Sequence, residues 1–295
     1  MGDEGAARLA GRVKRPHGVD EDGIRIGRIL HSPVYRGHIT NMELPPLTAD
    51  MTLIQHGDVA GQAEPNIGGC SLPIFSNQNL RWLGQPILAV TGESPDAVDN
   101  WLSQVKLDIH ESTVEPFVTD EFQRKKGNSF KVFQNAFQII EENIVIPLQE
   151  GKRECAGVSC LKKKDFFQLH VETIWQGLLC RSIAEVLHVP IETVEVHSYD
   201  AGGGQSMQKT LWYPVHASII AALLSQKADH SVCIPPSETG IGPSLAGAMI
   251  HLKEAINAQG QIIALDGDIT INTGAFLPFE DEHTTRLILG IFSVY

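Results

Sequence analysis

The sequence predicts an α+β fold in two parts, and three observations lead to this prediction. Residues 24–118 contain, in order, three stretches with strand character, one helix and one further strand. Residues 119–136 are polar and of mixed character, as is typical of a linker. Residues 137–295 alternate strands with amphipathic helices, which indicates a second α/β domain. We therefore expect domains at residues 1–118 and 137–295, joined by a linker at residues 119–136.

The helix of the first part has a clear start signal. Ser94 can cap the first turn, Pro95 suits the first helical position, and Asp96 adds an acid near the positive helix end. We expect this helix to continue to about Gln104. Its expected buried face consists of Ala97, Val98, Trp101 and Leu102. The other elements expected here are strands at 84–92 and 105–111, and two shorter strands within 24–45, broken at Ser32-Pro33 and Arg36-Gly37.

The second part contains a strongly amphipathic helix at residues 174–189. Pro190 follows it and cannot continue a helix. Asp266 and Asp268 are two residues apart on an expected strand, so both should lie on one solvated face. The other elements expected here are a strand at 139–148, a hairpin at 157–173 that turns at its lysines, a strand at 191–199, a helix at 214–227, a strand at 231–236 and a hairpin at 248–274 that turns at Asn257 to Gly260.

Composition excludes several classes of protein. A net charge of −12 argues against nucleic-acid binding, because affinity for phosphates needs clustered Lys and Arg. The five cysteines form no CxxC pair and the histidines no HxH or HxxxH pair, which favours buried reduced thiols over a metal site. The longest apolar run is shorter than the roughly 20 residues of a membrane span, and no signal peptide is visible. We expect a soluble, cytoplasmic protein without metal ligands of its own.

Three consecutive glycines, Gly202 to Gly204, lie between an expected strand and an expected helix. Glycine lets the backbone take positive φ and lets a ligand approach the main chain closely. The loop fits neither a dinucleotide-binding fingerprint, because Met207 occupies the third glycine position, nor a phosphate-binding GK[ST] loop. From the residues alone, a structural turn and a ligand cradle both remain open.

The order of several segments resembles the molybdenum hydroxylases, the xanthine dehydrogenase and aldehyde oxidase family. "GRILHSPVYRGHI" is similar to the opening signature of that family, and "LGQPILAVTGESPDAVDNWLSQVKLDI" is similar to its next block. "ETIWQGLLCRSIAEVLHVPIETVEVHSYDAGGG" resembles the block that ends in the family's glycine loop. The blocks follow the family's order from about residue 7 to residue 295, so the resemblance covers nearly the whole chain.

The resemblance implies a fold and a function. Residues 1–118 would form an α/β hammerhead domain, and residues 137–295 the first part of the molybdopterin-binding domain. The protein would be part of the molybdopterin-binding subunit of an oxidoreductase that hydroxylates a heterocycle or an aldehyde with oxygen from water. Its partners would be the remaining half of the molybdenum subunit and separate iron–sulfur and FAD subunits.

The resemblance also implies site residues. Gln176 matches the glutamine of the family's T-Q motif, which lies near the metal's oxo group; alternatively, it is only a polar residue at a helix start. Gly202, Gly203 and Gly204 match the glycines that pass close to the molybdenum, and Gln205 replaces a phenylalanine that borders the substrate channel. Beyond them the sequence departs from the family. Ser206 and Met207 replace two glycines that pack near the cofactor, and Lys209 or Thr210 stands where purine-oxidising members place a glutamate, which argues against xanthine as the substrate.

No catalytic residue is expected within these 295 residues. The family's general base and most pterin contacts belong to a second half that this sequence does not contain. We therefore expect a truncated domain or fragment that is inactive alone and binds molybdopterin only with the missing half. The alternative explanation for the apolar residues near Tyr295 is a partner that covers this end. The alternative hypothesis is a non-catalytic, divergent relative that acts as an assembly or interaction module.

Overall fold

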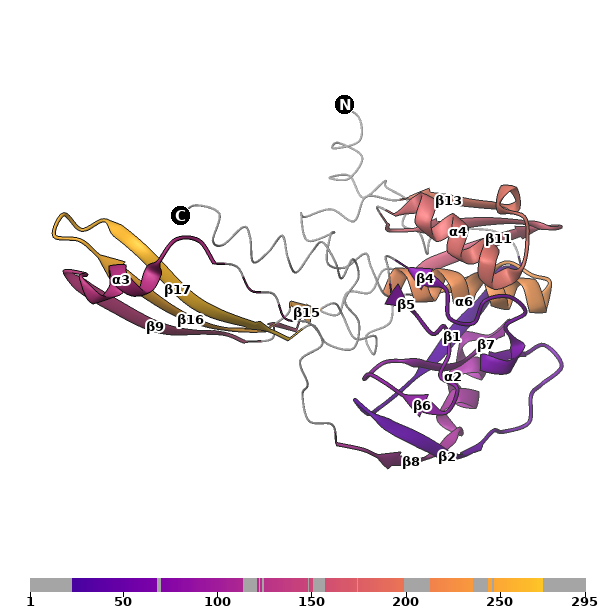
Figure 1. The fold of residues 1–295 in the computed structure, drawn as a ribbon. Coiled ribbons are helices and arrows are strands. Elements are labelled where there is room, and N and C mark those ends of the chain that lie inside the picture. Colours follow the sequence, from indigo (N-terminus) through magenta and orange to yellow (C-terminus); the bar gives the residue numbers. More distant parts are fainter. Residues whose placement is uncertain are drawn as a thin grey trace, which may run out of the picture. The chain divides into compact units, whose positions relative to one another are not determined.

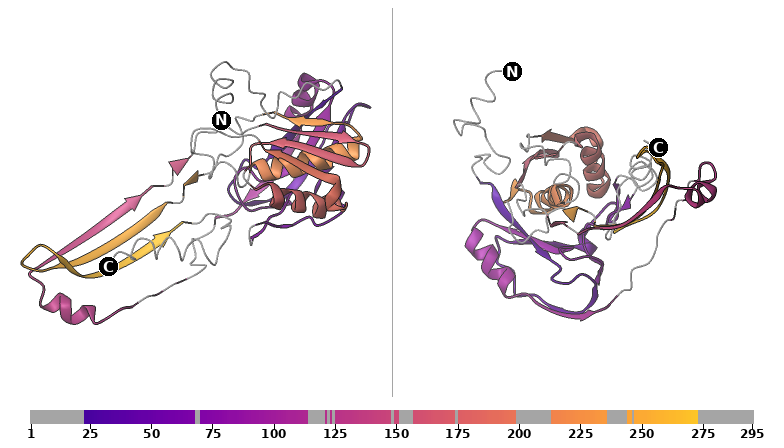
Figure 2. Two further views of the ribbon diagram at one scale, coloured as in Figure 1. Left: turned by 90° about the horizontal axis from the view of Figure 1, so that it is seen from above. Right: turned by 90° about the vertical axis from the view of Figure 1, so that its left-hand side faces the viewer.

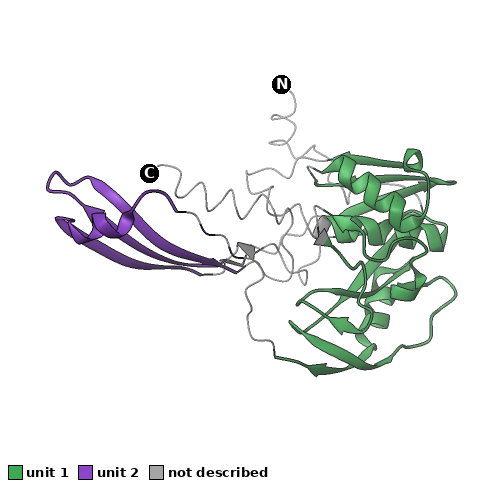
Figure 3. Cartoon of the chain, viewed as in Figure 1, with its two compact units in different colours: residues 1–67, 71–114, 151–243 green, residues 68–70, 115–150, 244–295 purple. Residues whose placement is uncertain are grey.

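The computed structural model describes the chain from residue 23 to residue 272, with gaps. The described residues are 23–67, 70–113, 121, 123, 125–147, 149–150, 157–173, 175–198, 213–235, 244–245 and 247–272. Two compact units emerge from the contacts between residues (Figure 3). Unit 1 comprises residues 1–67, 71–114 and 151–243, and unit 2 comprises residues 68–70, 115–150 and 244–295.

A seven-stranded mixed sheet forms the centre of unit 1 (Figure 1). Its strand order is β13-β12-β11-β14-β1-β7-β3. Strand β1 pairs in parallel with β14 and antiparallel with β7, so it joins strands from the two ends of the unit's sequence. The strands are β1 (Arg25–His31), β3 (Thr52–Gln55), β7 (Pro86–Gly92), β11 (Val158–Lys163), β12 (Phe166–Val171), β13 (Val194–Ser198) and β14 (Val232–Ile234).

Helix α2 (Pro95–Ser103) covers one face of this sheet and begins as the sequence predicts. The Ser94 hydroxyl accepts a hydrogen bond from the Ala97 N–H at 3.3 Å, and Pro95 is the first helical residue. Trp101 is buried and its indole N–H donates to the carbonyls of Pro45 and Pro46, each at 3.2 Å. The core under this helix consists of Met51, Leu88, Val90, Val98 and Trp101.

Helices α4 (Gln176–Leu187) and α6 (Tyr213–Ala228) lie on the opposite face. Neighbouring residues on a strand point to opposite faces. Gly27 of β1 faces α6, because a Cβ at this position would lie 3.2 Å from Leu224 Cδ1. Its neighbour Arg28 faces α2, because its guanidinium donates a hydrogen bond to the Asp99 carboxylate at 2.7 Å. Buried side chains line α6 from Val215 to Leu224, so it is the central helix of unit 1.

Short elements complete unit 1. A three-stranded sheet of order β6-β2-β8 packs around the buried Ile39, Leu80 and Ile87. Helix α4 ends at His188 in the left-handed conformation, just before Pro190 as predicted. The remaining elements are β2 (Gly37–Glu43), β6 (Asn79–Leu80), β8 (Lys106–Glu111), β4 (Asn66–Ile67), and the 3-10 helices η1 (His56–Asp58) and η2 (Ile191–Thr193). The division between the units falls within β5 (Cys70–Ser71).

Unit 2 contains a long three-stranded antiparallel sheet of order β17-β16-β9 (Figure 2). Strands β16 and β17 form the predicted hairpin, and the Gly260 N–H closes its turn by donating to the Asn257 carbonyl at 3.0 Å. The elements are α3 (Ser129–Gln134), β9 (Gln138–Ile146), β16 (Ala248–Ile256), β17 (Ile262–Ile271), and the short pair β10 (Gln149–Glu150) and β15 (Ser244–Leu245).

The α+β fold class is confirmed by these mixed sheets and helices. The expected hairpin at residues 157–173 is also confirmed, with Lys164 in the turn at φ 56°. The expected linker at 119–136 contains α3. The domain boundaries at residues 118 and 136 stay a prediction, because a compact unit and a family's domain are different divisions of a chain.

Candidate functional site

Two parallel strands of unit 1 end at the same edge of the sheet. Strands β12 and β13 are parallel neighbours, and their last residues, Val171 and Ser198, are paired. The chain leaves β12 toward α4, and it leaves β13 toward the glycine loop that precedes α6. In open α/β sheets ligands bind outside the carboxyl ends of parallel strands. The two segments that the sequence selects, the one at Gln176 and the glycine loop, therefore both start from this edge.

Thr173 connects the two segments. It is 3% exposed, and its carbonyl accepts a hydrogen bond from the Ser198 hydroxyl. Its own hydroxyl accepts from the Trp175 N–H at 3.1 Å. The backbone just before Gln176 is thus fixed both to its own turn and to the end of β13.

Gln176 is the first residue of α4, and its side chain is exposed. The first hydrogen bond of the helix runs from the Leu179 N–H to the Trp175 carbonyl at 2.9 Å. The side-chain amide of Gln176 can donate and accept hydrogen bonds. The first N–H groups of the helix lack partners within the helix. The position fits both interpretations from the sequence, a contact to a bound group and a polar residue at a helix start.

The other predicted site residues, Gly202, Gly203, Gly204 and Gln205, lie outside the described residues. The structure describes both flanks of their loop, which are Ser198 and the start of α6 at Tyr213. The proximity of the glycines to Gln176 therefore stays a prediction.

His216 fixes the first turn of α6, directly after this loop. Its side chain is buried, and its Nε2 lies 3.2 Å from the Pro73 carbonyl oxygen. Its ring is 6.0 Å from the Trp82 ring. Burial, and then the neighbouring His216, lower the pKa of His31 from an ordinary value of 6.5 to about 4. Sequence reasoning missed Thr173, Ser198 and His216, because their partners are distant in sequence.

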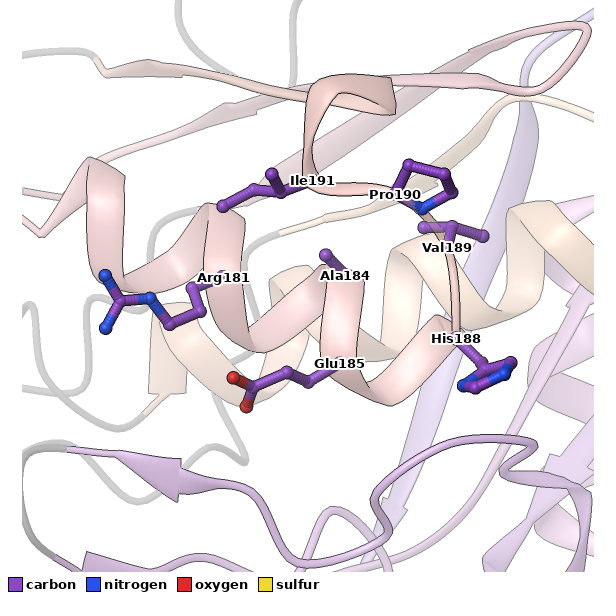
Figure 4. A pocket seen from close by; sticks show the side chains of 7 residues that line it. All are labelled: Arg181, Ala184, Glu185, His188, Val189, Pro190 and Ile191. Atoms are coloured by element: carbon purple, nitrogen blue, oxygen red, sulfur yellow. The ribbon is translucent and has the colours of Figure 1, made fainter.

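A pocket of about 560 Å³ lies along the other end of α4 (Figure 4). Arg181, Glu185 and His188 contribute polar groups, and Pro190 and Ile191 contribute apolar ones. The rise along the axis of an α-helix is about 1.5 Å per residue, so His188 lies about 18 Å along the helix from Gln176. This pocket is therefore separate from the strand edge that the sequence selects.

The described residues offer no metal site made of protein side chains. Within them, no group of three or more His, Cys, Asp or Glu residues is arranged to hold a metal ion. Burial raises the pKa of the Cys160 thiol to about 12 and also raises that of Cys233, so both stay neutral. No helix in the described part of the chain is long and apolar enough to cross a membrane.

Comparison with known proteins decides the family. A sequence model of the molybdopterin cofactor-binding domain matches residues 109–295. The chain belongs to this family. The predicted relationship to the molybdenum hydroxylases is thereby confirmed. A protein of Bacillus subtilis (strain 168), described as a probable subunit of xanthine dehydrogenase, is 22% identical, over 95% of this chain and 41% of the relative.

Solved structures agree with the molybdopterin-binding family in fold. The quinoline 2-oxidoreductase of Pseudomonas putida 86 has a TM-score of 0.76 at 16% identity, over 90% of this chain and 38% of that chain. The aldehyde oxidoreductase of Desulfovibrio gigas has a TM-score of 0.73 at 15% identity, over 90% of this chain and 33% of that chain. The chain thus spans less than half the length of these relatives, and it shares their fold.

Proposed function

We propose that this chain supplies the first part of the molybdopterin-binding subunit of an oxidoreductase that hydroxylates an aldehyde or an N-heterocycle. The family match carries the proposal, since it covers residues 109–295. The names of two similar structures, an aldehyde oxidoreductase and a quinoline 2-oxidoreductase, support this pair of substrate classes.

The residues at the edge of β12 and β13 fit a bound cofactor. Gln176 is exposed beside a backbone that Thr173 holds in place, so its amide is free to orient toward a polar group. In this proposal Gln176 positions a polar group of the cofactor or substrate, Gly202 to Gly204 offer bare main chain to the cofactor, and Gln205 borders the substrate channel. The cofactor, when bound, supplies the oxidation that adds a water-derived oxygen to carbon.

The proposal includes partners. The match covers 41% of the length of the Bacillus subtilis relative. The name of that relative describes it as one subunit of an enzyme. We propose that the polypeptide equivalent to the remaining part completes the cofactor site, and that iron–sulfur and FAD subunits carry the electrons away. The complex would work in the cytoplasm.

A non-catalytic role remains the second candidate, and one sequence observation favours it. Ser206 and Met207 stand where the resemblance predicts glycines close to the cofactor. Side chains there narrow the space for a bulky ligand. An assembly or interaction module would tolerate them.

The experiment is an isotope measurement on the native complex. The chain, tagged in its own cells, is purified with its bound subunits and incubated with aldehydes or N-heterocycles and an artificial electron acceptor in water enriched in ¹⁸O. The proposal predicts one ¹⁸O atom in the product of an N-heterocycle, and up to two in the carboxylate formed from an aldehyde, because the aldehyde oxygen itself exchanges with water. Mass spectrometry detects both products. Product oxygen that comes from O₂ would refute it, and an absence of product across both classes would favour the non-catalytic role.

A further inference from the structure

The three-stranded sheet of unit 2 has one apolar face. Side chains alternate between the two faces of a strand, and the register aligns them across strands. One row contains Ile146, Ala248 and Ile271, and a second row, two residues along, contains Ile144, Ile250 and Ile269. We call this surface the apolar face. Its aliphatic residues are Ile140, Ile144, Ile146, Ala248, Ile250, Leu252, Ile256, Ile262, Leu265, Ile269 and Ile271.

The opposite face is polar. His251 Nδ1 lies 2.9 Å from Asn143 Oδ1, and Lys253 Nζ lies 3.6 Å from Glu141 Oε2. Asp266 and Asp268 are exposed on this face, as the sequence predicts. Helix α3 packs here too, because the Lys253 ammonium lies 6.0 Å from the Phe133 ring centre.

The apolar face has no packing partner among the described residues of unit 2. Their one helix, α3, lies on the polar face. An apolar sheet face left in water is unfavourable, and packing of another surface against it removes that cost. Burial of these aliphatic side chains would stabilise the sheet. Ile269 and Ile271 are half-buried, whereas Thr270 between them, on the polar face, is exposed.

We propose that the C-terminal residues 286–295 of this chain cover the apolar face. These residues lie outside the described ranges, and their sequence is RLILGIFSVY, which is almost wholly apolar. Strand β17 ends at Ile271, in the last row of the apolar face. Residues 272–285 can span up to about 45 Å when extended, which exceeds the roughly 30 Å length of a nine-residue strand. The segment can therefore reach every row.

Charge supports this occupant. The charged residues within the apolar face are Glu142 and Glu254, which are both acidic. The charged residue of the segment is Arg286, which is basic. A second copy of the sheet would present the same two acids, Glu142 and Glu254, and no basic residue to pair with them. The segment therefore suits this surface better than a second sheet does.

The experiment compares side-chain accessibility with and without the segment. Hydroxyl-radical footprinting, read by mass spectrometry, is applied to the full chain and to a chain that ends at Asn272. The proposal predicts that oxidation of Ile250 and Ile269 rises roughly threefold in the shorter chain, because their cover is gone. Met249, which neighbours Ile250 but lies on the polar face with 60% exposure, is the internal control and should change little.

A point variant of the full chain controls for misfolding of the shorter chain. In the full chain, Ile291→Asp should expose the same residues, whereas the matched control Thr284→Asp, outside the apolar run, should not. Equal oxidation of the apolar face in both chain lengths, or in both point variants, would overturn the proposal. Protection that disappears on dilution, together with a dimer in sedimentation, would also overturn it and assign the face to a second copy. The proposal does not depend on the cofactor, so it and the proposed function can fail separately.

Discussion

Gln176 combines an exposed side chain with a fixed backbone. Because the side chain is exposed, Gln176→Ala should change the free energy of unfolding by less than about 0.5 kcal/mol. If its amide holds the cofactor or substrate, the same change should lower turnover of the native complex about tenfold, the equivalent of one hydrogen bond. The control is Gln104→Ala, an exposed glutamine at the end of α2. Unchanged turnover and molybdenum content in Gln176→Ala would show that Gln176 only starts a helix.

His31 predicts a pH dependence of stability. Burial, then His216, lower its pKa from 6.5 to about 4 in the folded protein. Between these values the unfolded chain binds a proton that the folded protein does not, so the free energy of unfolding falls as pH falls. The loss begins below pH 6.5 and is complete near pH 4, with a size of about 3 kcal/mol.

Urea unfolding between pH 7 and pH 4 measures this loss. His31→Gln should reduce the fall in stability across that range, whereas His38→Gln, which replaces an exposed histidine, should leave it as it is. Equal pH profiles for the natural protein and His31→Gln would contradict the role of His31.

Sequence reasoning could select Gln176 and the glycines at the residue scale, because residue types and their order carry that resemblance. It could not select Ser198, whose hydroxyl bonds a carbonyl 25 residues away. Nor could it select His216, whose contact at Pro73 is 143 residues away. Such contacts depend on strand register, which has no local signal in one sequence.

Helices and long strands follow local signals at the element scale. The Ser94-Pro95 start of α2 and the Pro190 stop after α4 act through nearby backbone groups, and both are confirmed. The short strands β4, β5 and β6, two residues each, were not predicted. A strand of that length has no periodicity, since its pairing depends on a distant partner.

The loop at Gly61 provides the sharpest prediction for an element. Its N–H donates to the Val186 carbonyl at 3.0 Å, which ties the loop to the end of α4. A Cβ at this position would lie 2.0 Å from the Glu185 carbonyl oxygen, so one of the two backbones must move. Gly61→Ala should therefore destabilise unit 1 by about 2 kcal/mol or more.

Gly57→Ala is the matched control, because a Cβ there meets nothing within 4 Å. Thermal unfolding of the two variants should separate them clearly. Equal melting temperatures would contradict the tight packing of the loop on α4.

Pairing between distant strands sets the architecture at the scale of the whole molecule. Strand β1 pairs with β14 through Arg25 opposite Val232 and Ile26 opposite Cys233. The predicted domain boundary separates these two strands along the chain, whereas one compact unit contains both. Their pairing could not be predicted, because order along the chain is the main topological signal that a single sequence offers. The fold class and the family could nevertheless be predicted from the sequence, since both depend on the order of elements and motifs.

The most direct test of the central claim is the molybdenum and pterin content of the native complex. The chain, tagged and purified with its subunits from molybdenum-replete cells, is measured by plasma mass spectrometry and by fluorescence of oxidised pterin. Our account predicts about one molybdenum and one pterin for each copy of this chain, as expected for a single tight cofactor site. A folded, complete complex that contains neither would contradict it.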